Sequence, residues 1–555
     1  MWWIAGGFLV LVLLFLWQLF GPSPRIVVSR QTTYITAPLK PNGLPDYGKY
    51  LLDKSREGVT PENNAAVLLW QALWPGELDP QHYALMADAL GLEEIPTGEE
   101  SLQPFRGDQN RGRILAWLRS SDAMAAANDG QPAPDASYET DWDRERIGVI
   151  FNQTPARPWT SAEFPPLAEW VAENNGPLDM VVEASRRPRY WSPWPELLDG
   201  SDTSLYDATV PDLEGMREAG RALAVRAMWN LGEGRPAEAW DDLQAIYRLG
   251  RLAAQGPTLI DQFIAWGLYG IAWDGTATLV GSKTLNEREA RTIQHDLEEV
   301  TPFNSIVNAM DVAERVASLD ATLHMRSGDP LEDDLVERTA LKHGLDWNVV
   351  LREYNRWYDR FIAAAQLPDH SARAEAVARL TNELAQLDSR LDGPIDAFGV
   401  MLSRRARSQL IANMLVSLLL PAVESAVNAE DYANTQLEII RLAAALAVYR
   451  AEHGTYPEKL ADVVPEVLPT LPVDPYHAKP FVYQRDGAGY LLYSPGPNGG
   501  DDGGSNIDRH IVAGQEIDGL PEDEYEKLCE QLSADAGADD VSIRVPRPPL
   551  ALPTH

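Results

Sequence analysis

Apolar residues in the central part of the chain recur at the spacing of one helix face. Residues three or four positions apart lie on the same side of an α-helix. In the first part of residues 213–300 these positions are occupied by Met216, Gly220, Leu223 and Ala227. A glycine-containing run ends this pattern at Gly234, and Pro236 opens the next one, where Ala239 and Leu243 continue the spacing. Glycine after one helix and proline at the start of the next are typical of helix boundaries, so the stretch predicts a helical hairpin.

One segment in this part is apolar on almost every side. Residues 261–280 carry the following large side chains: Phe263, Ile264, Trp266, Leu268, Ile271 and Trp273. A helix that is hydrophobic all round is buried in the core of a protein. We therefore expect this helix at the centre of a mainly helical body that spans residues 61–404.

Residues 128–212 differ from the rest of this body, because prolines are dense and tryptophans punctuate them. The tryptophans are Trp142, Trp159, Trp170, Trp191 and Trp194. One interpretation is an aromatic groove that binds a sugar or a peptide. The other is that the rings fasten irregular segments onto the helical body, and we favour it because tryptophan dominates burial wherever it occurs.

The periodicity changes again near the C-terminus. Residues 405–453 predict one long helix, with Pro421 as a kink or a junction, since proline removes a backbone hydrogen bond. Short alternating runs at 480–484 and 489–493 follow, and the turn between them predicts a β-hairpin. A helix followed by a small antiparallel sheet is an α+β unit, which we place at residues 405–515.

The N-terminus carries an apolar run without any formal charge, from Trp2 to Phe20. At a rise of about 1.5 Å per residue, a helix of this length just spans a hydrocarbon core of about 30 Å. A cleaved signal peptide would normally begin with basic residues and end in a small-residue cleavage site, and Gly21-Pro-Ser-Pro24 is a poor one. We interpret the run as a retained single-pass anchor in the inner membrane, which residues 21–60 connect to the body.

Composition narrows the classes of function. The chain has 555 residues, which predicts two to four structural units, and a formal net charge of −35. Non-specific nucleic-acid binding needs a basic surface, which is not expected in a chain this acidic. We therefore expect no nucleic-acid partner. The single cysteine, Cys529, excludes an intramolecular disulfide, and the nine histidines show no pair at metal-ligand spacing.

The expected fold class is mainly α, with an N-terminal transmembrane helix, a large helical body and a C-terminal α+β domain made of a long helix and a small antiparallel sheet. The expected organisation is a transmembrane anchor at 1–20, a linker at 21–60, the helical body at 61–404, the α+β domain at 405–515, and an acidic, then proline-rich tail at 516–555.

Four motifs follow one another in residues 410–510. They are Pro421 within the long helix, the helix end Tyr449–Pro457, the Leu-Pro-Val-Asp-Pro turn at 471–475, and the Tyr-Ser-Pro-Gly-Pro-Asn-Gly loop at 493–499. This order resembles the major pseudopilin of type II secretion and its pilin-like relatives. A pilin has its apolar helix at the very N-terminus after a processing site, whereas here the helix is internal. The resemblance therefore implies a pilin-like fold used as a fixed domain of a membrane-anchored bacterial protein.

Two opposing indications bear on which side of the membrane holds the body. Arg25, Arg30 and Lys40 follow the apolar run and no basic residue precedes it, which by the positive-inside rule alone places the body in the cytoplasm. The pilin resemblance implies the opposite side. We expect the bulk of the chain to be extracytoplasmic.

The loop from Asn498 to Asp508 concentrates oxygen donors among glycines. Ca²⁺ prefers several oxygen ligands, and glycine lets the backbone turn so that carbonyl groups can join them. In the pseudopilins this loop binds calcium, so the resemblance implies Ca²⁺ as a cofactor, in a site weakened where asparagine replaces an expected carboxylate. The implied ligand set is Asn498, Asp501, Asp502, Ser505, Asn506 and Asp508. The alternative is a flexible turn without metal.

Motifs for known catalytic sites are absent from the sequence, including a Walker loop, a Gly-x-Ser-x-Gly elbow, a His-Glu-x-x-His helix and a Rossmann glycine triplet. The first hypothesis is therefore a non-enzymatic, membrane-anchored interaction or scaffold protein, with other envelope or secretion proteins as partners. The second is a component of a type II secretion or pilus-like assembly. The third is an extracytoplasmic hydrolase with its site in the tryptophan-rich region.

Overall fold

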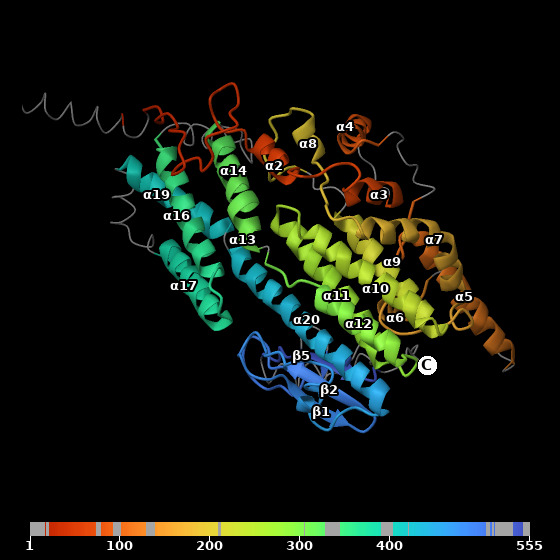
Figure 1. Ribbon diagram of the computed structural model, residues 1–555. Helices are drawn as coiled ribbons and strands as arrows, with labels where there is room; N and C mark the ends of the chain where they lie inside the picture. Colours follow the sequence, from red (N-terminus) through yellow and green to blue (C-terminus); the bar gives the residue numbers. More distant parts are fainter. Residues whose placement is uncertain are drawn as a thin grey trace, which may run out of the picture.

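The computed structural model shows a mainly helical molecule with a small antiparallel sheet at one end (Figure 1). One hydrophobic core runs through it, from Ile35 near the N-terminus to Val545 near the C-terminus. The structure describes residues 17, 21–73, 79–92, 101–128, 139–208, 213–304, 306–327, 344–389, 403–419, 421–506, 511–512, 515–516 and 537–547.

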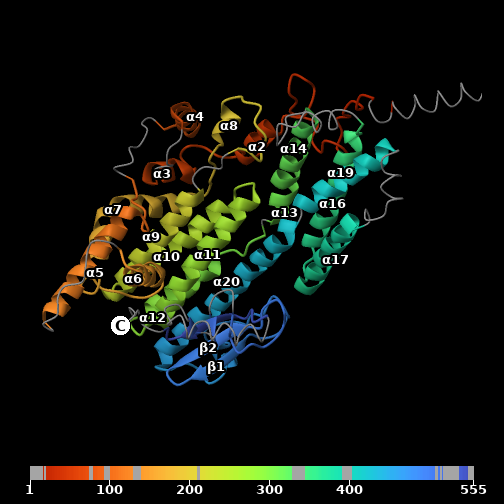
Figure 2. The same cartoon turned by 180° about the vertical axis from the view of Figure 1, so that it is seen from behind.

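Four helices form the centre of the molecule (Figures 1 and 2). The predicted hairpin is confirmed, because α9 and α10 are antiparallel neighbours and both pack on α11. Gly220 allows α9 to approach α11 closely, since a Cβ atom there would lie 2.5 Å from Leu268 Cδ2. The predicted core helix is α11, although Phe263 near its start is 44% exposed rather than buried. The bounds are α9 Leu213–Gly232, α10 Pro236–Ala253, α11 Leu259–Gly281 and α12 Glu287–Glu299.

The tryptophan-rich stretch is more regular than its prolines predict. It contains α6, which begins with a capping box of Thr140 and Asp143. It also contains α7 and the short α8, whose prolines fit the first turn of a helix, where the missing N–H is not needed. Four of its tryptophans are buried, and Trp142 is partly buried below the side chain of Arg146. The rings therefore fasten this stretch to the body, as we favoured. Here the bounds are α5 Asp108–Asn128, α6 Asp141–Gln153, α7 Pro165–Ser185 and α8 Pro195–Leu198.

The segment between residue 21 and α3 lies folded on the body. Tyr34 donates a hydrogen bond to Asp311 at 2.9 Å, and its ring lies 4.4 Å from the guanidinium of buried Arg315. Asn348 bonds the backbone of Val27 and of Arg25. This part forms one edge of the molecule with the following helices: α2 Tyr47–Ser55, α3 Ala65–Ala72 and α4 Pro80–Leu90.

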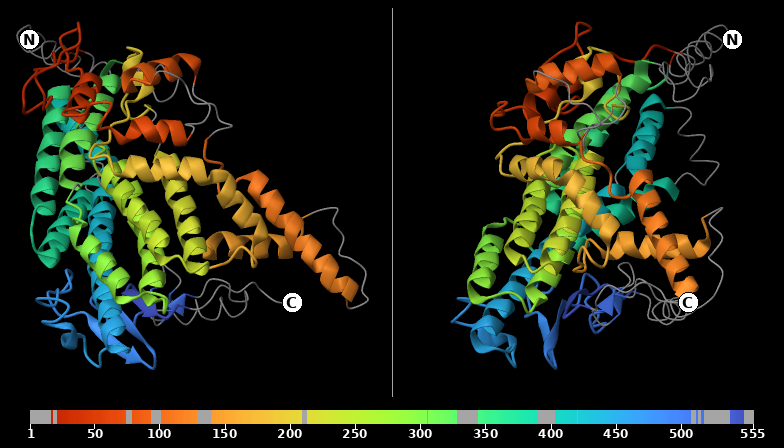
Figure 3. Two further views of the ribbon diagram at one scale, coloured as in Figure 1. Left: turned by 45° about the vertical axis from the view of Figure 1, so that its right-hand side comes forward. Right: turned by 90° about the vertical axis from the view of Figure 1, so that its right-hand side faces the viewer.

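A second group of helices lies beside the central four (Figure 3). A π-helical turn at Met310–Glu314 joins α13 to α14, so that these elements form one continuous rod. Beside it, α16 packs on α14, α17 and α19. The bounds are α13 Ile306–Ala309, α14 Arg315–Ser327, α16 Trp347–Ala365, α17 His370–Ser389 and α19 Arg404–Leu419.

The predicted long helix is divided at Pro421, which starts α20 (Pro421–His453) after α19. Residues 439–448 of α20 are buried on all sides except at Arg441, because α11 and α12 cover one side and the sheet covers the other. Met414 in the apolar run of α19 is 50% exposed. A 3₁₀ turn at Leu460–Val463 follows α20.

The sheet has three antiparallel strands in the order β1-β2-β5. The predicted hairpin is confirmed as β1 (Val482–Asp486) and β2 (Gly489–Ser494). The third strand, β5 (Val541–Val545), comes from the region that the sequence assigns to the tail, and pairs with β2 from Tyr490↔Val545 to Ser494↔Val541. A separate short pair consists of β3 (Ile511–Val512) and β4 (Gln515–Glu516).

Among the residues that the structure describes, no helix combines the length and the apolar character needed to cross a bilayer. The predicted anchor at residues 2–20 lies outside the described residues apart from Trp17. It therefore stays a prediction.

Candidate metal site

The glycine-rich loop after β2 lies against the segment that leads into β5. Ser505 accepts a backbone hydrogen bond from Asp540 at 3.0 Å, and Ser542 donates to the carbonyl of Gly504 at 2.7 Å. Gly496 is in the left-handed region with φ of 65°, and a Cβ atom there would lie 2.3 Å from the carbonyl oxygen of Asp539. Glycine at this position therefore allows the two segments to meet.

Three carboxylates converge where these segments meet. One oxygen each of Asp502, Asp539 and Asp540 lies within 4.8 Å of the others. We call these residues the Asp540 trio. Asp502 and Asp539 are partly buried, and the side chain of Asp540 is 0% exposed. Three negative charges this close repel one another strongly unless a proton or a cation compensates them.

The two oxygens of Asp540 have different surroundings. Oδ2 accepts backbone hydrogen bonds from Gly504 at 2.7 Å and from Asp502 at 3.2 Å. Oδ1 is buried and has no hydrogen-bond partner, and the same is true of Oδ2 of Asp502. Buried polar oxygens normally have a partner, so these two atoms are available to a bound ligand.

The electrostatic effect of the trio appears in the pKa of Asp540. Burial is the main cause that raises this pKa to about 7, and the nearby charges of Asp502 and Asp501 raise it further. The hydrogen bonds from Gly504 and Asp502 act in the opposite direction. A cation between the carboxylates would act against this upward shift and keep Asp540 ionised.

Of the six residues expected from the sequence, only Asp502 belongs to the trio. The side-chain amide of Asn498 is hydrogen-bonded at both ends, since it donates to the carbonyl of Gly537 in the segment before β5 and accepts from the N–H of Gly500 in the loop. Its backbone N–H donates to Asp539. Asp501 accepts from Tyr493 Oη at 2.8 Å. These residues shape the loop and its partner segment.

Ser505 and Asn506 connect the loop to the segment before β5, since the side-chain amide of Asn506 donates to the carbonyl of Asp540 at 3.0 Å. Asp508 lies outside the described residues. The sequence reasoning missed Asp539 and Asp540. A signal was present in the Asp pair that directly precedes the alternating stretch 541–545. No local sequence pattern, however, indicates that this pair contacts a loop more than thirty residues earlier.

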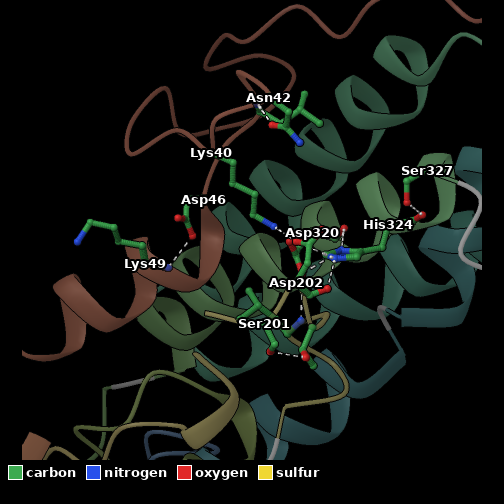
Figure 4. Close-up of polar contacts among 12 residues, drawn as sticks. Lys40, Asn42, Asp46, Lys49, Ser201, Asp202, Asp320, His324 and Ser327 are labelled. Carbon is green, nitrogen blue, oxygen red and sulfur yellow. Dashed lines mark hydrogen bonds and ion pairs between the residues drawn. The ribbon is translucent and has the colours of Figure 1, made fainter. Parts of the chain in front are cut away.

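A second cluster of acidic residues lies at α14, beside Lys40 and His324 (Figure 4). We call Lys40, Asp202, Asp320 and His324 the His324 cluster. The imidazole lies 3.0 Å from the carbonyl oxygen of Asp320 through Nδ1 and 3.1 Å from that of Asp202 through Nε2. The ring therefore bridges the backbone of the two acidic residues. Lys40 also pairs with the carboxylate of Asp202.

No protein-family model matches the chain, no curated protein matches its sequence, and no solved structure matches its fold.

Proposed function

We propose that the chain is a membrane-anchored interaction protein whose C-terminal α+β unit is held together by a bound Ca²⁺ ion. The observation that carries the calcium proposal is the pair of buried carboxylate oxygens, Asp540 Oδ1 and Asp502 Oδ2, that have no hydrogen-bond partner. Both belong to a cluster whose third member, Asp539, is equally close.

The chemistry of the donors supports Ca²⁺ over softer metals. All three side chains of the Asp540 trio offer carboxylate oxygen, which suits hard cations, whereas Zn²⁺ is usually held by histidine and cysteine. The pseudopilin resemblance of residues 410–510 supports the same ion. In this chain Asp539 and Asp540 would supply the carboxylates that Asn498 and Asn506 cannot.

The ion would couple two segments that are distant in the chain. Asp502 belongs to the loop after β2, while Asp539 and Asp540 lead into β5, which is the third strand of the sheet. A ligand that binds only the folded form stabilises it by mass action. Ca²⁺ would therefore hold β5 in place, which gives it a structural role.

The burial of α20 supports a fixed domain over a fibre subunit. Residues 439–448 lie between the sheet on one side and α11 and α12 on the other, so this face is already covered within the chain. A fibre subunit would need such a face for its neighbours. The buried tryptophans likewise give no support to a hydrolase site in the 128–212 stretch.

Calorimetric titration of the full chain with Ca²⁺ tests the proposal. We expect binding of one ion to the wild type and none to Asp540→Asn, because the substitution removes the carboxylate at the centre of the trio. Glu466→Gln, which removes an exposed charge in the same unit, is the matched control and should bind as the wild type does. Equal binding by Asp540→Asn, or no binding by the folded wild type, would overturn the calcium proposal.

The anchor and the partners need separate tests. Alkaline extraction of membranes should leave the full chain in the membrane fraction, since a spanning helix resists it. Cross-linking in native membranes should then recover envelope proteins. Recovery of secretion or pilus machinery would instead favour a component of such an assembly.

A further inference from the structure

A small pocket lies at the start of α11, where this helix meets α2 and the segment that joins α7 to α8. The pocket offers a ligand about 30 Å³, which is room for roughly two groups the size of a water molecule. Its wall is mostly apolar, because aromatic and leucine side chains form the greater part of it. These side chains are Leu51, Leu52, Tyr190, Trp191, Trp194 and Leu197.

The carboxylate of Asp261 also lines this pocket. Asp261 is the third residue of α11 and is 2% exposed. Its Oδ2 closes a capping box, since it accepts hydrogen bonds from the backbone N–H of Thr258 at 2.8 Å and from the Thr258 hydroxyl at 2.6 Å. Its Oδ1 accepts no hydrogen bond from the described residues, so this oxygen is available to a ligand in the pocket.

Three other polar side chains of the pocket are already bonded within the protein. Ser55 Oγ accepts from Trp191 Nε1 at 3.1 Å, and Ser192 Oγ accepts from Trp70 Nε1 at 3.3 Å. The side-chain amide of Gln255 is hydrogen-bonded at both ends to backbone groups of the segment before α8. A ligand in the pocket therefore meets a carboxylate oxygen surrounded by apolar walls.

No basic side chain among the described residues pairs with Asp261. Burial raises its pKa to about 6, hydrogen bonds from Thr258 act against this rise, and the neighbouring charge of Glu314 adds to it. Asp143 holds the same capping-box position in α6, but it pairs with Arg119 at 3.2 Å. A buried carboxylate without a partner is costly, so the pocket favours a ligand that carries a positive charge.

A larger cavity of about 330 Å³ adjoins the pocket. Lys54, Glu57 and Arg189 contribute charged side chains to its lining. Lys54 pairs with Glu57 at 3.4 Å, and Arg189 donates to the carbonyl of Glu57 at 2.6 Å. This outer cavity has room for the tail of a ligand, and its surplus positive charge disfavours a second ammonium group there. The residues that line both spaces are Leu51, Ser55, Tyr190, Gln255 and Pro257.

We propose that this pocket binds the primary ammonium group of a small amine, with Asp261 as its counter-ion. The ammonium group donates to Oδ1, and the methylene groups next to it contact the leucines and the aromatic rings. Aromatic rings attract cations, and the guanidinium of Arg56 already lies 5.0 Å from the ring centroid of Trp191. The rest of the amine extends into the outer cavity. The site depends neither on bound Ca²⁺ nor on the membrane anchor.

Saturation-transfer NMR tests the proposal by measuring the Kd of n-butylammonium for the full chain in detergent, at a salt concentration that screens surface charges. We expect the wild type to bind n-butylammonium much more tightly than n-butanol, which has the same length without the charge. Asp261→Asn should bind it roughly 30-fold more weakly or worse, because it removes one partner of a buried charge pair. Leu52→Trp places a larger side chain at the pocket, leaves Asp261 intact, and should also prevent binding.

The matched control is Asp143→Asn, which makes the same change at the same capping-box position of α6, outside the pocket. It should bind n-butylammonium as the wild type does. Several outcomes would overturn the proposal: no binding by the folded wild type, unchanged binding by Asp261→Asn or by Leu52→Trp, an equal loss in Asp143→Asn, or equal affinity for n-butanol. If Asp261→Asn does not fold, Leu52→Trp still decides. A Ca²⁺ chelator should leave amine binding unchanged, so the calcium proposal and this one can fail separately.

Discussion

The Asp540 trio and the His324 cluster solve the same electrostatic problem in different ways. Each places a well-buried aspartate beside further carboxylate groups, and burial raises the pKa of Asp540 and of Asp320 alike. In the His324 cluster, Lys40 pairs with Asp202, and the imidazole lies 3.4 Å from the carboxylate of Asp320. In the trio, Asp540 Oδ1 and Asp502 Oδ2 have no hydrogen-bond partner among the described residues. Acidic residues therefore form a candidate ion site only where the fold leaves their oxygens without partners.

The largest expected effect separates the two clusters by calcium. At a free Ca²⁺ concentration about 100-fold above Kd, binding would stabilise the folded chain by about 2.7 kcal/mol. We expect a chelator to lower the Tm of the wild type and to leave that of Asp540→Asn unchanged, as measured by scanning calorimetry. A chelator effect of equal size in both would break the distinction.

Substitution within the His324 cluster should be nearly as costly, and independent of calcium. His324→Leu removes the ring that contacts two carbonyl groups and the buried carboxylate of Asp320, for which we expect a loss of about 2 kcal/mol. Denaturant unfolding with and without Ca²⁺ measures it. The loss should be the same in both conditions, and a dependence on Ca²⁺ would show that the clusters are coupled.

The pH dependence of stability should differ between calcium-loaded and calcium-free protein. The folded-state pKa of Asp540, about 7, lies above its ordinary value of 3.8, so the folded chain binds this proton more tightly than the unfolded chain. Its contribution is fully present below about pH 4 and is lost as the pH rises through about 7. Without Ca²⁺ the free energy of unfolding should fall over this range relative to Asp540→Asn, and saturating Ca²⁺ should reverse the trend.

The smallest effect concerns a cation at the rim of the His324 cluster. Lys40 pairs with Asp202, whose side chain is mostly exposed, and exposed ion pairs contribute about 0–1 kcal/mol. We therefore expect Lys40→Gln to lower the free energy of unfolding by less than 1 kcal/mol, less still at high salt. A loss as large as that of His324→Leu would show that Lys40 contributes as much to the cluster as the imidazole does.

Helix and strand positions could largely be predicted because they depend on local patterns. The spacing of Met216 and Leu223 locates α9, and Pro421 marks the start of α20. The prediction from local patterns was wrong at Phe263, which lies exposed near the start of an apolar helix. It was also wrong for 141–185, where a capping box begins α6 and prolines begin α7.

The candidate site was predictable only in part. The glycine-rich loop and Asp502 stand out in the sequence, because glycine and oxygen donors are concentrated there. Asp539 and Asp540 could not be assigned to it, because they reach the loop only when β5 pairs with β2. The position of Asn498 in the loop predicts a ligand, yet its side-chain amide is hydrogen-bonded to Gly537 and Gly500.

By itself the sequence determined the mainly helical class, the α+β unit near the C-terminus, the acidic character and the apolar N-terminal run, since these depend on composition and on residues a few positions apart. Three contacts follow from the tertiary structure alone: Asp540 meets Asp502, His324 bridges Asp202 and Asp320, and Arg404 donates to the carbonyl of Gly21. These contacts join residues far apart in the chain, so they depend on how packed helices and paired strands bring distant segments together.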